Sequence, residues 1–322
     1  MAVYTEVGGK ALEAFLEPYA LGSLTAAKGI AEGVENSNYR IETTRGRFIL
    51  TLYEKRVQPE DLPFFIALMR HLVAAGVACP QPVAARDGAV LRRLAGRPAA
   101  LFTFLSGLSP QWVQNWHCAA LGRALARLHR AAEGFPGSRP NRLSVASWQP
   151  LIEDCRAGAN AVSQNLREEL DEACKTISAA WPRALPSGIV HADLFPDNVF
   201  FCGKDLSGLI DFYFACTDFY AYDLAICLNA WCFDSAHRYV PERGAALIEA
   251  YIRERRLSTA ELQALPTLAA GAALRFLLTR LYDWLNCPPG AMVRPKDPRE
   301  YLTRLRFHRI AEGPETYGFV DC

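Results

Sequence analysis

The chain has 322 residues, of which 51% are hydrophobic and 21% are charged, and its formal net charge is +1. This length favours two joined lobes over a single core, and the near-neutral charge provides no large field of one sign to attract nucleic acid or a membrane surface. The ten cysteines are scattered without a C-x-x-C pair, which disfavours a zinc site and favours reduced thiols.

The ends and the apolar stretches of the chain indicate where it resides. Its first residues lack the basic-then-apolar pattern of a signal peptide. The longest apolar stretch, residues 262–281, is interrupted by Pro266, Arg275 and Arg280. We therefore expect a soluble, cytoplasmic protein with neither a membrane nor a nucleic acid as partner. The sequence does not predict an oligomeric state.

The first third of the chain predicts two helices and an antiparallel sheet. Gly46 is placed for a hairpin turn. Gly22 and Gly76 each follow a helical pattern, as C-terminal capping glycines do. The expected elements are, in chain order, a helix at 11–20, three β runs within 24–52, a helix at 61–75, and strands at 89–94 and 99–105.

From Gly107 onward the pattern is mostly helical. Helices are expected at 118–129, within 151–180, and from 220 almost to the end, whereas 185–211 contains short extended runs. The predicted fold class is α+β and bilobal. It consists of a β-rich N-terminal lobe at 1–104 with an antiparallel sheet and a mostly helical C-terminal lobe at 105–322, joined by a hinge at 102–107.

The most informative segment is HADLFPDN at residues 191–198, followed by LIDF at 209–212. Apolar β runs flank Gly203, so the interval between the two motifs predicts a short antiparallel hairpin. Such a hairpin brings Asn198, at its entry, beside Asp211, at its exit. Amide and carboxylate oxygens are ligands that Mg²⁺ accepts when phosphate oxygens and waters complete its octahedron.

Asp193 lies on the loop that leads into this hairpin. Its carboxylate is placed to accept a hydrogen bond from a substrate hydroxyl that faces the γ-phosphate of ATP, and to take the proton late in a loose transition state. His191 is predicted to brace the loop. Isolated acids are usually surface or capping groups, and a metal hydrolase built on the same acids is an alternative. The spacing, however, matches kinase catalytic loops.

A second candidate segment precedes the catalytic loop by some 160 residues. Gly29 and Gly33 permit close backbone approach, and Asn36, Ser37 and Asn38 add side-chain donors where the β- and γ-phosphates would lie. A glycine-bearing hairpin is by itself more often only a turn. Its position ahead of the catalytic loop favours nucleotide binding.

The segment after Asp211 limits the size of the substrate. Only six residues separate it from Asp218, which leaves no room for the activation loop of a protein kinase. We therefore expect a small-molecule substrate. Asp223, close behind, is predicted to be a helix N-terminal acid that braces a loop rather than a ligand group.

Together these segments resemble the aminoglycoside phosphotransferase-like kinases, a family with a bilobal, protein-kinase-like fold that includes choline, methylthioribose and homoserine kinases. The strings GIAEGVENSNY at 29–39 and FILTLYEKR at 48–56 are most similar to the homoserine kinases of this fold. The resemblance covers nearly the whole chain. It implies ATP and L-homoserine as substrates and O-phospho-L-homoserine, a step toward threonine, as product.

The resemblance also implies roles for individual residues. Asp193 would be the catalytic carboxylate, with His191 beside it, and Asn198 and Asp211 would hold Mg²⁺. Residues 102–106, with Phe104 at their centre, would form the hinge edge for adenine. Two alternatives remain: another small-molecule hydroxyl kinase of the choline, methylthioribose or aminoglycoside type, and a catalytically inactive nucleotide-binding module.

One departure from the superfamily pattern concerns phosphate binding. Thr51 stands where the superfamily has a β3 lysine, and the acid that pairs with that lysine is also missing, because the only acids near the following helix, Glu60 and Asp61, stand at its start. Losing both partners costs less than burying one alone. Lys55 could supply a charge if the strand bends. The loss shifts phosphate binding toward Mg²⁺ and residues 29–38.

The α-ammonium and α-carboxylate of homoserine require an acid and preferably an arginine near Asp193. Arg275 and Arg280 are candidates because they interrupt an otherwise apolar helix. Snorkelling or an ion pair with Asp283 would explain them equally well. Further candidates for this pocket, although aromatic residues at helical spacing are more often core, are Tyr213, Asp218 and Trp284.

Overall fold

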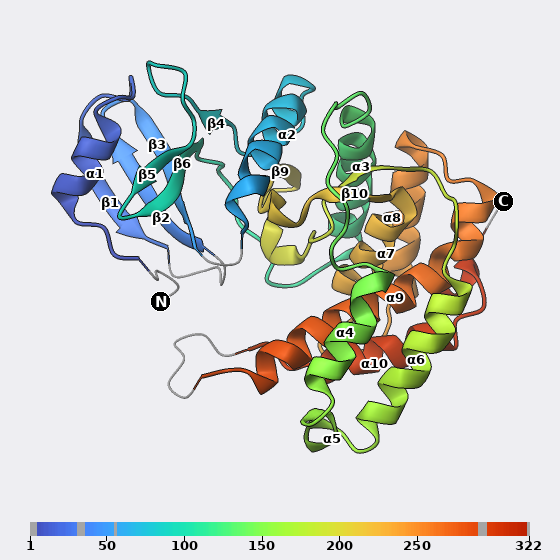
Figure 1. Cartoon of the computed structure of the whole chain (residues 1–322). Helices are drawn as coiled ribbons and strands as arrows, with labels where there is room; N and C mark the ends of the chain where they lie inside the picture. Colours follow the sequence, from blue (N-terminus) through green and yellow to red (C-terminus); the bar gives the residue numbers. More distant parts are fainter. Residues whose placement is uncertain (1–4, 31–35, 55–56, 289–294, 321–322) are drawn as a thin grey trace. The chain divides into compact units, whose positions relative to one another are not determined.

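A computed structural model describes residues 5–30, 36–54, 57–288 and 295–320 of the chain. The chain divides into two compact units, and its elements are labelled in Figure 1. The first unit comprises Met1–Ser106 together with Gly208–Tyr213, and the second comprises Gly107–Ser207 together with Phe214–Cys322. A short segment that follows the catalytic-loop motif therefore belongs to the first unit.

An antiparallel sheet forms the first unit. Its strands run in the order β1-β2-β3-β6-β4, and β5 pairs with β6. Thr43 pairs with Gly46, so the β2–β3 hairpin turns at Thr44 and Arg45, and Gly46 has the positive φ of +145° that the turn needs. The elements of this unit are α1 (Gly9–Leu16), β1 (Leu24–Gly29), β2 (Asn36–Thr43), β3 (Gly46–Tyr53), η1 (Pro59–Asp61), α2 (Leu62–Ala74), β4 (Pro82–Val83), β5 (Arg92–Leu94) and β6 (Arg97–Thr103).

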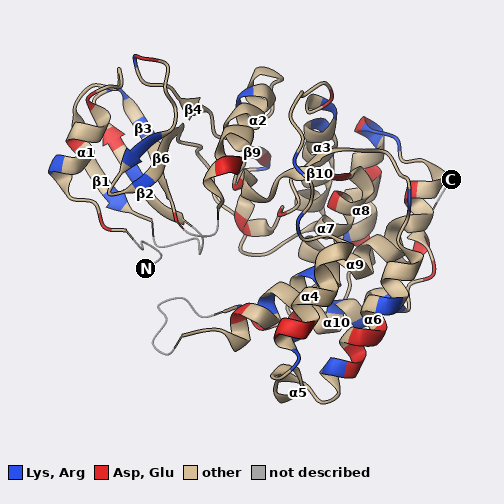
Figure 2. Ribbon diagram, in the orientation of Figure 1, with Lys and Arg blue, Asp and Glu red and all other residues tan. Residues whose placement is uncertain are grey.

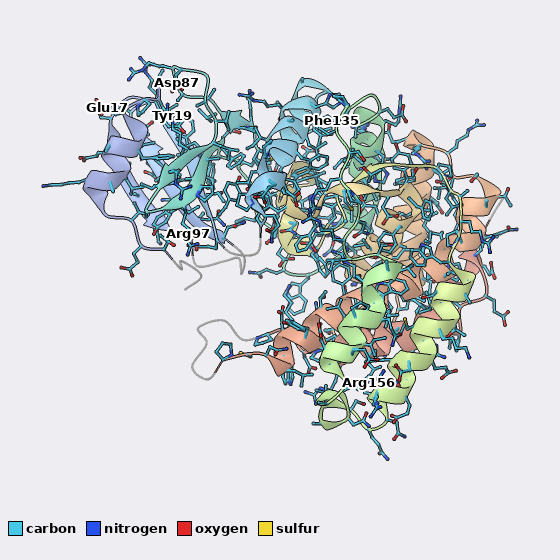
Figure 3. The ribbon with its side chains drawn as sticks, viewed as in Figure 1. Glu17, Tyr19, Asp87, Arg97, Phe135 and Arg156 are labelled. Carbon is cyan, nitrogen blue, oxygen red and sulfur yellow. The ribbon has the colours of Figure 1, made fainter. Side chains whose placement is uncertain are left out.

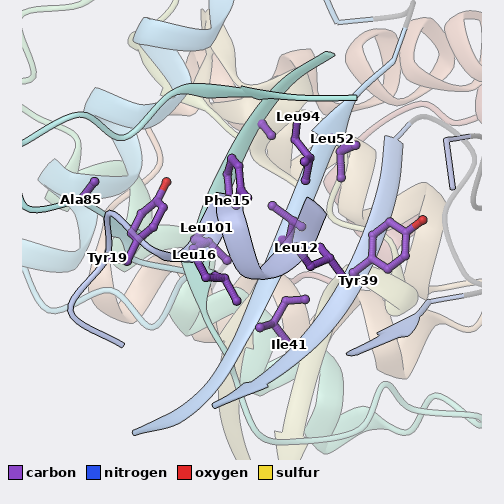
Figure 4. Packing of buried hydrophobic residues seen from close by; sticks show 12 residues of the cluster. Leu12, Phe15, Leu16, Tyr19, Tyr39, Ile41, Leu52, Ala85, Leu94 and Leu101 are labelled. Carbon is purple, nitrogen blue, oxygen red and sulfur yellow. The ribbon is translucent and has the colours of Figure 1, made fainter. Parts of the chain in front are cut away.

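The core of this unit lies between α1 and one face of the sheet (Figure 4). Leu12, Phe15 and Leu16 point from α1 toward the strands, as residues three and four apart on a helix do. Ile41 and Leu101 meet them from β2 and β6. Burial of such side chains contributes about 1.5–3 kcal/mol each, which makes this cluster a major source of stability for the sheet.

The second unit is mostly helical, as predicted, with two small sheets that pair β7 with β10 and β8 with β9. The long helix α9 packs against α4, α6, α7 and α10. The elements are α3 (Asn115–Ala131), α4 (Val145–Cys155), α5 (Ala159–Val162), α6 (Leu166–Ala180), β7 (Ser187–Val190), η2 (Pro196–Asn198), β8 (Val199–Cys202), β9 (Asp205–Leu209), η3 (Phe212–Phe214), β10 (Cys216–Phe219), α7 (Tyr220–Trp231), α8 (Pro241–Glu254), α9 (Thr259–Leu285), α10 (Arg299–Arg309) and η4 (Pro314–Tyr317). The end of β9 and the first two residues of η3 belong to the first unit.

Most of the expected elements are present, and the differences lie at their ends. The helical region at 151–180 is divided into α4, α5 and α6. Asn165 separates α5 from α6, because it adopts a left-handed conformation (φ +58°) that no α-helix continues through. The first helix ends at Leu16 and not at residue 20. Strand β10 was not predicted, and α7 begins at Tyr220, so that Asp223 lies within its first turn.

Charged residues of both signs are interspersed along the elements (Figure 2). Several of them join neighbouring segments within a unit. Arg97 lies 3.2 Å from Glu54 in the first unit, and in the second Arg156, just after α4, lies 3.1 Å from Asp171 of α6. Figure 3 labels the two arginines among the side chains drawn as sticks. Such partly exposed pairs contribute at most about 1 kcal/mol each, so the apolar interior is the larger source of stability.

Helix α9 is long and apolar enough to cross a membrane by length and composition, but 72% of its most apolar window is buried inside the structure. The core helix of a folded protein has the same composition, so this finding is weak evidence for a membrane span. Arg275 and Arg280 both lie on this helix, as expected. The cytoplasmic location stays a prediction.

A buried polar network joins α7, α9, α10 and η4. The imidazole of His308 lies 3.2 Å from Asn229 Oδ1 and 3.0 Å from the hydroxyl of Tyr317, and the amide of Asn229 donates to the carbonyls of Ala225 and Ala269. Burial, aided by the nearby Arg304, lowers the pKa of His308 to about 3. The ring is therefore neutral and links the helix carbonyls to η4.

This network predicts a pH-dependent stability. Because the pKa of His308 is about 3 in the folded chain and about 6.5 when unfolded, the unfolded state binds a proton as pH falls from 6.5 to 3. Stability is thus fully present above pH 6.5 and is lost by about 1.4 kcal/mol per pH unit below it. In urea titrations at pH 6, 5 and 4, the deficit of His308→Gln in free energy of unfolding, relative to wild type, should become smaller as pH falls. A constant deficit would contradict the assignment.

Candidate functional site

The HADLFPDN motif forms the loop between β7 and the short helix η2 in the second unit. The side-chain amide of Asn198 donates to the backbone carbonyl of Asp193 at 2.8 Å and to its carboxylate Oδ2 at 3.1 Å. The N–H of Phe195 also donates to the Asp193 carbonyl, at 2.8 Å. Asn198 therefore holds Asp193 in one orientation. The sequence had predicted Asn198 as a metal ligand.

The backbone just before Asp193 is anchored on both sides. Asp223 accepts hydrogen bonds from the N–H groups of His191 (2.7 Å) and Ala192 (2.8 Å), and the guanidinium of Arg275 donates to the carbonyl of Ala192 (2.8 Å). Ala192 has a φ of +62°, which is costly for a residue with a Cβ. Backbone strain of this kind persists only where the surrounding contacts impose it. Here the buried carboxylate of Asp223 and the buried guanidinium of Arg275 impose it.

Asp223 is itself fixed by a network that links three helices. Nε2 of His129 on α3 lies 3.0 Å from the carboxylate of Asp223, and Nδ1 lies 2.8 Å from the hydroxyl of Tyr251 on α8. Burial alone would raise the pKa of Asp223, but hydrogen bonds from His129 and His191 hold it below its usual range. Burial lowers the pKa of His129. The pair therefore consists of a carboxylate and a neutral imidazole that donates to it.

We expect Asp223→Asn to impair both stability and turnover. The side-chain amide of the asparagine has one accepting oxygen and one donating nitrogen. Its nitrogen would face a buried N–H group that now donates to Asp223, and that N–H group would lose its acceptor. The free energy of unfolding should fall by about 3 kcal/mol, and kcat should fall with it because the loop before Asp193 loosens. Asp154→Asn, an exposed acid on α4, serves as control. Denaturant melts and initial rates measure the two effects, and wild-type stability in Asp223→Asn would refute the role.

The first unit contains Asp211, the second expected metal ligand, in another uncommon conformation. Its φ is +65°, again in the left-handed region. Two residues later, the hydroxyl of Tyr213 lies 3.2 Å from that of Tyr53 on β3, and its ring meets Phe65 of α2 edge to face at 5.6 Å. The segment that carries Asp211 is thus packed against strand and helix through Tyr213.

Thr51, at the expected lysine position, belongs to the same network. Its hydroxyl donates to Asn38 Oδ1 at 2.8 Å and interacts with the hydroxyl of Tyr213. Thr51 is only 3% exposed. Among the residues that the structure describes, neutral hydroxyl and amide groups therefore occupy the position at which the superfamily has an ion pair.

The other candidate phosphate-binding residues occupy different environments. Gly29 ends β1, whereas Gly33 lies outside the described residues, as does Lys55. Ser37 is fully buried and donates to Glu54 at 2.8 Å, and Asn36 accepts from the backbone N–H of Glu54 at 3.4 Å. Phe104, which was predicted to lie in the hinge, lies beneath Arg47, whose guanidinium carbon is 4.5 Å from the ring centroid.

The expected substrate residues are also placed by the structure. Arg275 is 2% exposed and holds the catalytic loop, and Arg280 pairs with Glu300 at 2.8 Å. Asp218 accepts from Asn141 at 2.7 Å, and burial raises its pKa. Trp284, near the C-terminal end of α9, is 40% exposed. Their part in substrate binding stays a prediction.

The described residues contain no group of three or more His, Cys, Asp or Glu side chains that could hold a metal ion. This disfavours a preformed zinc-type site there. Magnesium bound with a nucleotide needs only one or two protein oxygens, because phosphates and waters supply the remainder. Asn198 and Asp211 provide an amide and a carboxylate of the required kind.

Comparisons with known proteins connect this geometry to a family. Residues 26–258 match the model of the phosphotransferase enzyme family. The homoserine kinase of Rhodospirillum rubrum is 58% identical over 318 residues, covering 99% of each chain, and that of Xanthobacter autotrophicus is 58% identical over 99% of this chain and 100% of its own. The chain belongs to the phosphotransferase enzyme family, among its homoserine kinases. The kinase therefore uses ATP.

Solved structures place the kinase in the same fold. An amicoumacin kinase aligns with a TM-score of 0.69 at 16% identity, over 94% of this chain and 92% of its own. A microcompartment-associated aminopropanol kinase aligns with a TM-score of 0.65 at 17% identity, over 94% and 97%. The α+β phosphotransferase fold predicted from the sequence is thus confirmed.

Sequence reasoning did not identify His129 and Tyr251 as part of the site. A signal was present for His129, because it ends the apolar face of a predicted helix, where a polar side chain requires a partner. Its partners lie 94 and 122 residues away in the sequence, so no local pattern named them. The bracing role predicted for Asp223 is confirmed by its bonds to the loop.

Proposed function

We propose that this kinase transfers the γ-phosphoryl group of ATP to the side-chain hydroxyl of L-homoserine and so produces O-phospho-L-homoserine for threonine synthesis. The observation that supports this most strongly is full-length identity of 55–58% to homoserine kinases. The anchored Asp193 loop supports a phosphoryl transfer to a hydroxyl. A spectinomycin phosphotransferase and an aminoglycoside-3'-phosphotransferase of the same fold are 13% and 18% identical to this chain.

In the proposed mechanism Asp193 is the group that touches the reacting hydroxyl. Its carboxylate accepts the hydroxyl hydrogen bond, aims the oxygen at the γ-phosphorus and takes the proton as the new bond forms. Asn198 keeps the carboxylate in place through the 3.1 Å hydrogen bond, and the anchored backbone of Ala192 fixes the loop. Orientation of this kind accounts for much of the rate of phosphoryl transfer.

We assign Mg²⁺ to Asn198 and Asp211. The amide nitrogen of Asn198 is used on Asp193, which turns the amide oxygen toward other ligands, and an amide oxygen and a carboxylate are suitable hard donors. When bound with ATP, the ion neutralises charge on the phosphate oxygens. We assign residues 1–104 to nucleotide binding, with Gly29, Gly33, Asn36, Ser37, Asn38 and Thr51 near the phosphates and Phe104 at the adenine edge, and residues 105–322 to catalysis and substrate binding.

The decisive experiment identifies the product. The purified kinase is incubated with ATP, MgCl₂ and L-homoserine, and O-phospho-L-homoserine is sought by ³¹P NMR and mass spectrometry. Choline, methylthioribose and an aminoglycoside are tested in parallel by ADP release. We expect turnover with L-homoserine and little with the others. Turnover of another acceptor together with none of homoserine would overturn the proposed substrate but not the reaction type.

A further inference from the structure

The α-carboxylate of an amino-acid substrate requires a cation, and the two arginines of α9 already have partners. Arg275 donates to the carbonyl of Ala192, and Arg280 forms an ion pair of 2.8 Å with Glu300. A guanidinium already bound to a carboxylate has less charge to offer a second one. We therefore expect the cation that binds the carboxylate to be another arginine of the second unit.

Arg304, on α10, differs from these two. Its guanidinium lies over the rings of Tyr301 (4.5 Å) and Phe233 (5.2 Å), and within the described residues no carboxylate pairs with it. Its Nε–H is buried without a hydrogen-bond partner there, as is the Nε–H of Arg275. Unlike Arg275, the residue is only partly buried, so an anion can reach the rest of its guanidinium. The site thus has unsatisfied capacity for a negative group.

A second unsatisfied donor lies one helical turn away. Tyr301 is fully buried, and its hydroxyl hydrogen has no acceptor in the described part of the chain. Residues three apart on a helix share a face, so the phenol and the guanidinium of Arg304 lie next to each other on α10. A carboxylate would accept from both donors through its two oxygens.

The same two residues adjoin the catalytic loop. The ring of Tyr301 meets Phe276 at 5.2 Å and Phe195, two residues beyond Asp193, at 6.4 Å. Burial raises the pKa of Tyr301, and the charge of Asp193 adds to that rise although two arginines oppose it. In extended homoserine about 5 Å separates the hydroxyl oxygen from the carboxylate carbon. A substrate of this length suits a site with its hydroxyl end at Asp193.

We propose that Tyr301 and Arg304 bind the α-carboxylate of the amino-acid substrate and thereby select it over amino alcohols that lack this group. The inference rests on the proposed function and adds the residues that read the carboxylate. Arg280 takes a supporting part, because its guanidinium lies 4.4 Å from the centroid of the Tyr301 ring and its charge is balanced by Glu300.

The test compares L-homoserine with 3-aminopropan-1-ol, which is the same molecule with hydrogen in place of the carboxylate. In Arg304→Met, kcat/KM for homoserine should fall about 100-fold, chiefly through KM, since a charged hydrogen-bond pair is lost. The value for aminopropanol should change less than about threefold. Tyr301→Phe, which preserves the packing, should lower the homoserine value about tenfold.

Arg306→Met is the matched control, because Arg306 is on the same helix but is exposed and pairs with Glu169. It should retain the wild-type preference for homoserine. Equal losses for both substrates in Arg304→Met and Tyr301→Phe, or unchanged KM for homoserine in both, would overturn the inference. Wild-type enzyme that does not phosphorylate homoserine at all would instead refute the proposed function, so the two failures are distinguishable.

Discussion

Asp193→Asn should reduce kcat by about 10³–10⁴-fold while the affinity for ATP stays within a factor of about two. The amide has nearly the same shape and preserves the contact with Asn198, but it neither takes a proton nor orients a hydroxyl by accepting its hydrogen bond at the same strength. The loss should appear in kcat more than in KM for homoserine. Steady-state rates and ATP titration by calorimetry measure the two quantities.

Asp197→Asn is the control for this variant. Asp197 lies in the same loop, its side chain is 66% exposed, and it forms an ion pair of 3.5 Å with Lys296. We expect kcat within about twofold of wild type, since isolated surface ion pairs contribute little. If Asp193→Asn were as active as Asp197→Asn, the carboxylate of Asp193 would not be the group that receives the hydroxyl proton.

Asp211→Asn should lower kcat/KM for ATP about 10³-fold at cellular concentrations of Mg²⁺ and raise the Mg²⁺ concentration needed for half-maximal rate. An amide retains an oxygen donor but loses the negative charge, so it binds a divalent cation more weakly. Part of the activity should therefore return at high Mg²⁺. Rates measured at fixed ATP over a wide range of free Mg²⁺ show the shift.

A matched control is Asp205→Asn, because Asp205 is an exposed acid at the start of β9, six residues before Asp211. Its Mg²⁺ dependence should equal that of wild type. Thermal unfolding without nucleotide is a second control, because it distinguishes an Asp211→Asn variant that is misfolded from one that is folded but binds metal poorly. An unshifted Mg²⁺ curve in the folded Asp211→Asn would remove Asp211 from the metal site.

Local patterns predicted the elements that form from near neighbours in the chain. The hairpin at Gly46 and the C-cap at Gly76 follow from the freedom of glycine at positive φ, and both are present. The β8–β9 hairpin was expected because two apolar runs flank a turn at Gly203, and it forms there. Element ends were less predictable, since Asn165 interrupts a region of good helix formers through its backbone conformation.

The candidate site divides in the same way. Asp193 and Asn198 are five residues apart, so a single loop brings them together, and their spacing was visible in the sequence. The network around Asp223 joins residues from three helices. Sequence patterns do not show which faces of those helices pack against one another. Arg280 shows the limit, because its partner is Glu300 and not Asp283, the acid that the sequence offered as an alternative.

The sequence by itself determined the two-part α+β fold, the kinase chemistry and the residues expected to act on the hydroxyl, because motifs of fixed spacing encode them. Only the tertiary structure decided which buried charges have partners. Arg275 and Arg280 resembled each other and were equal candidates, yet Arg275 donates to the loop carbonyl of Ala192 and Arg280 pairs with a carboxylate, whereas Arg304 has neither kind of partner among the described residues. The physical reason is that hydrogen-bond satisfaction depends on packing between distant helices, and no periodicity along the chain records that packing.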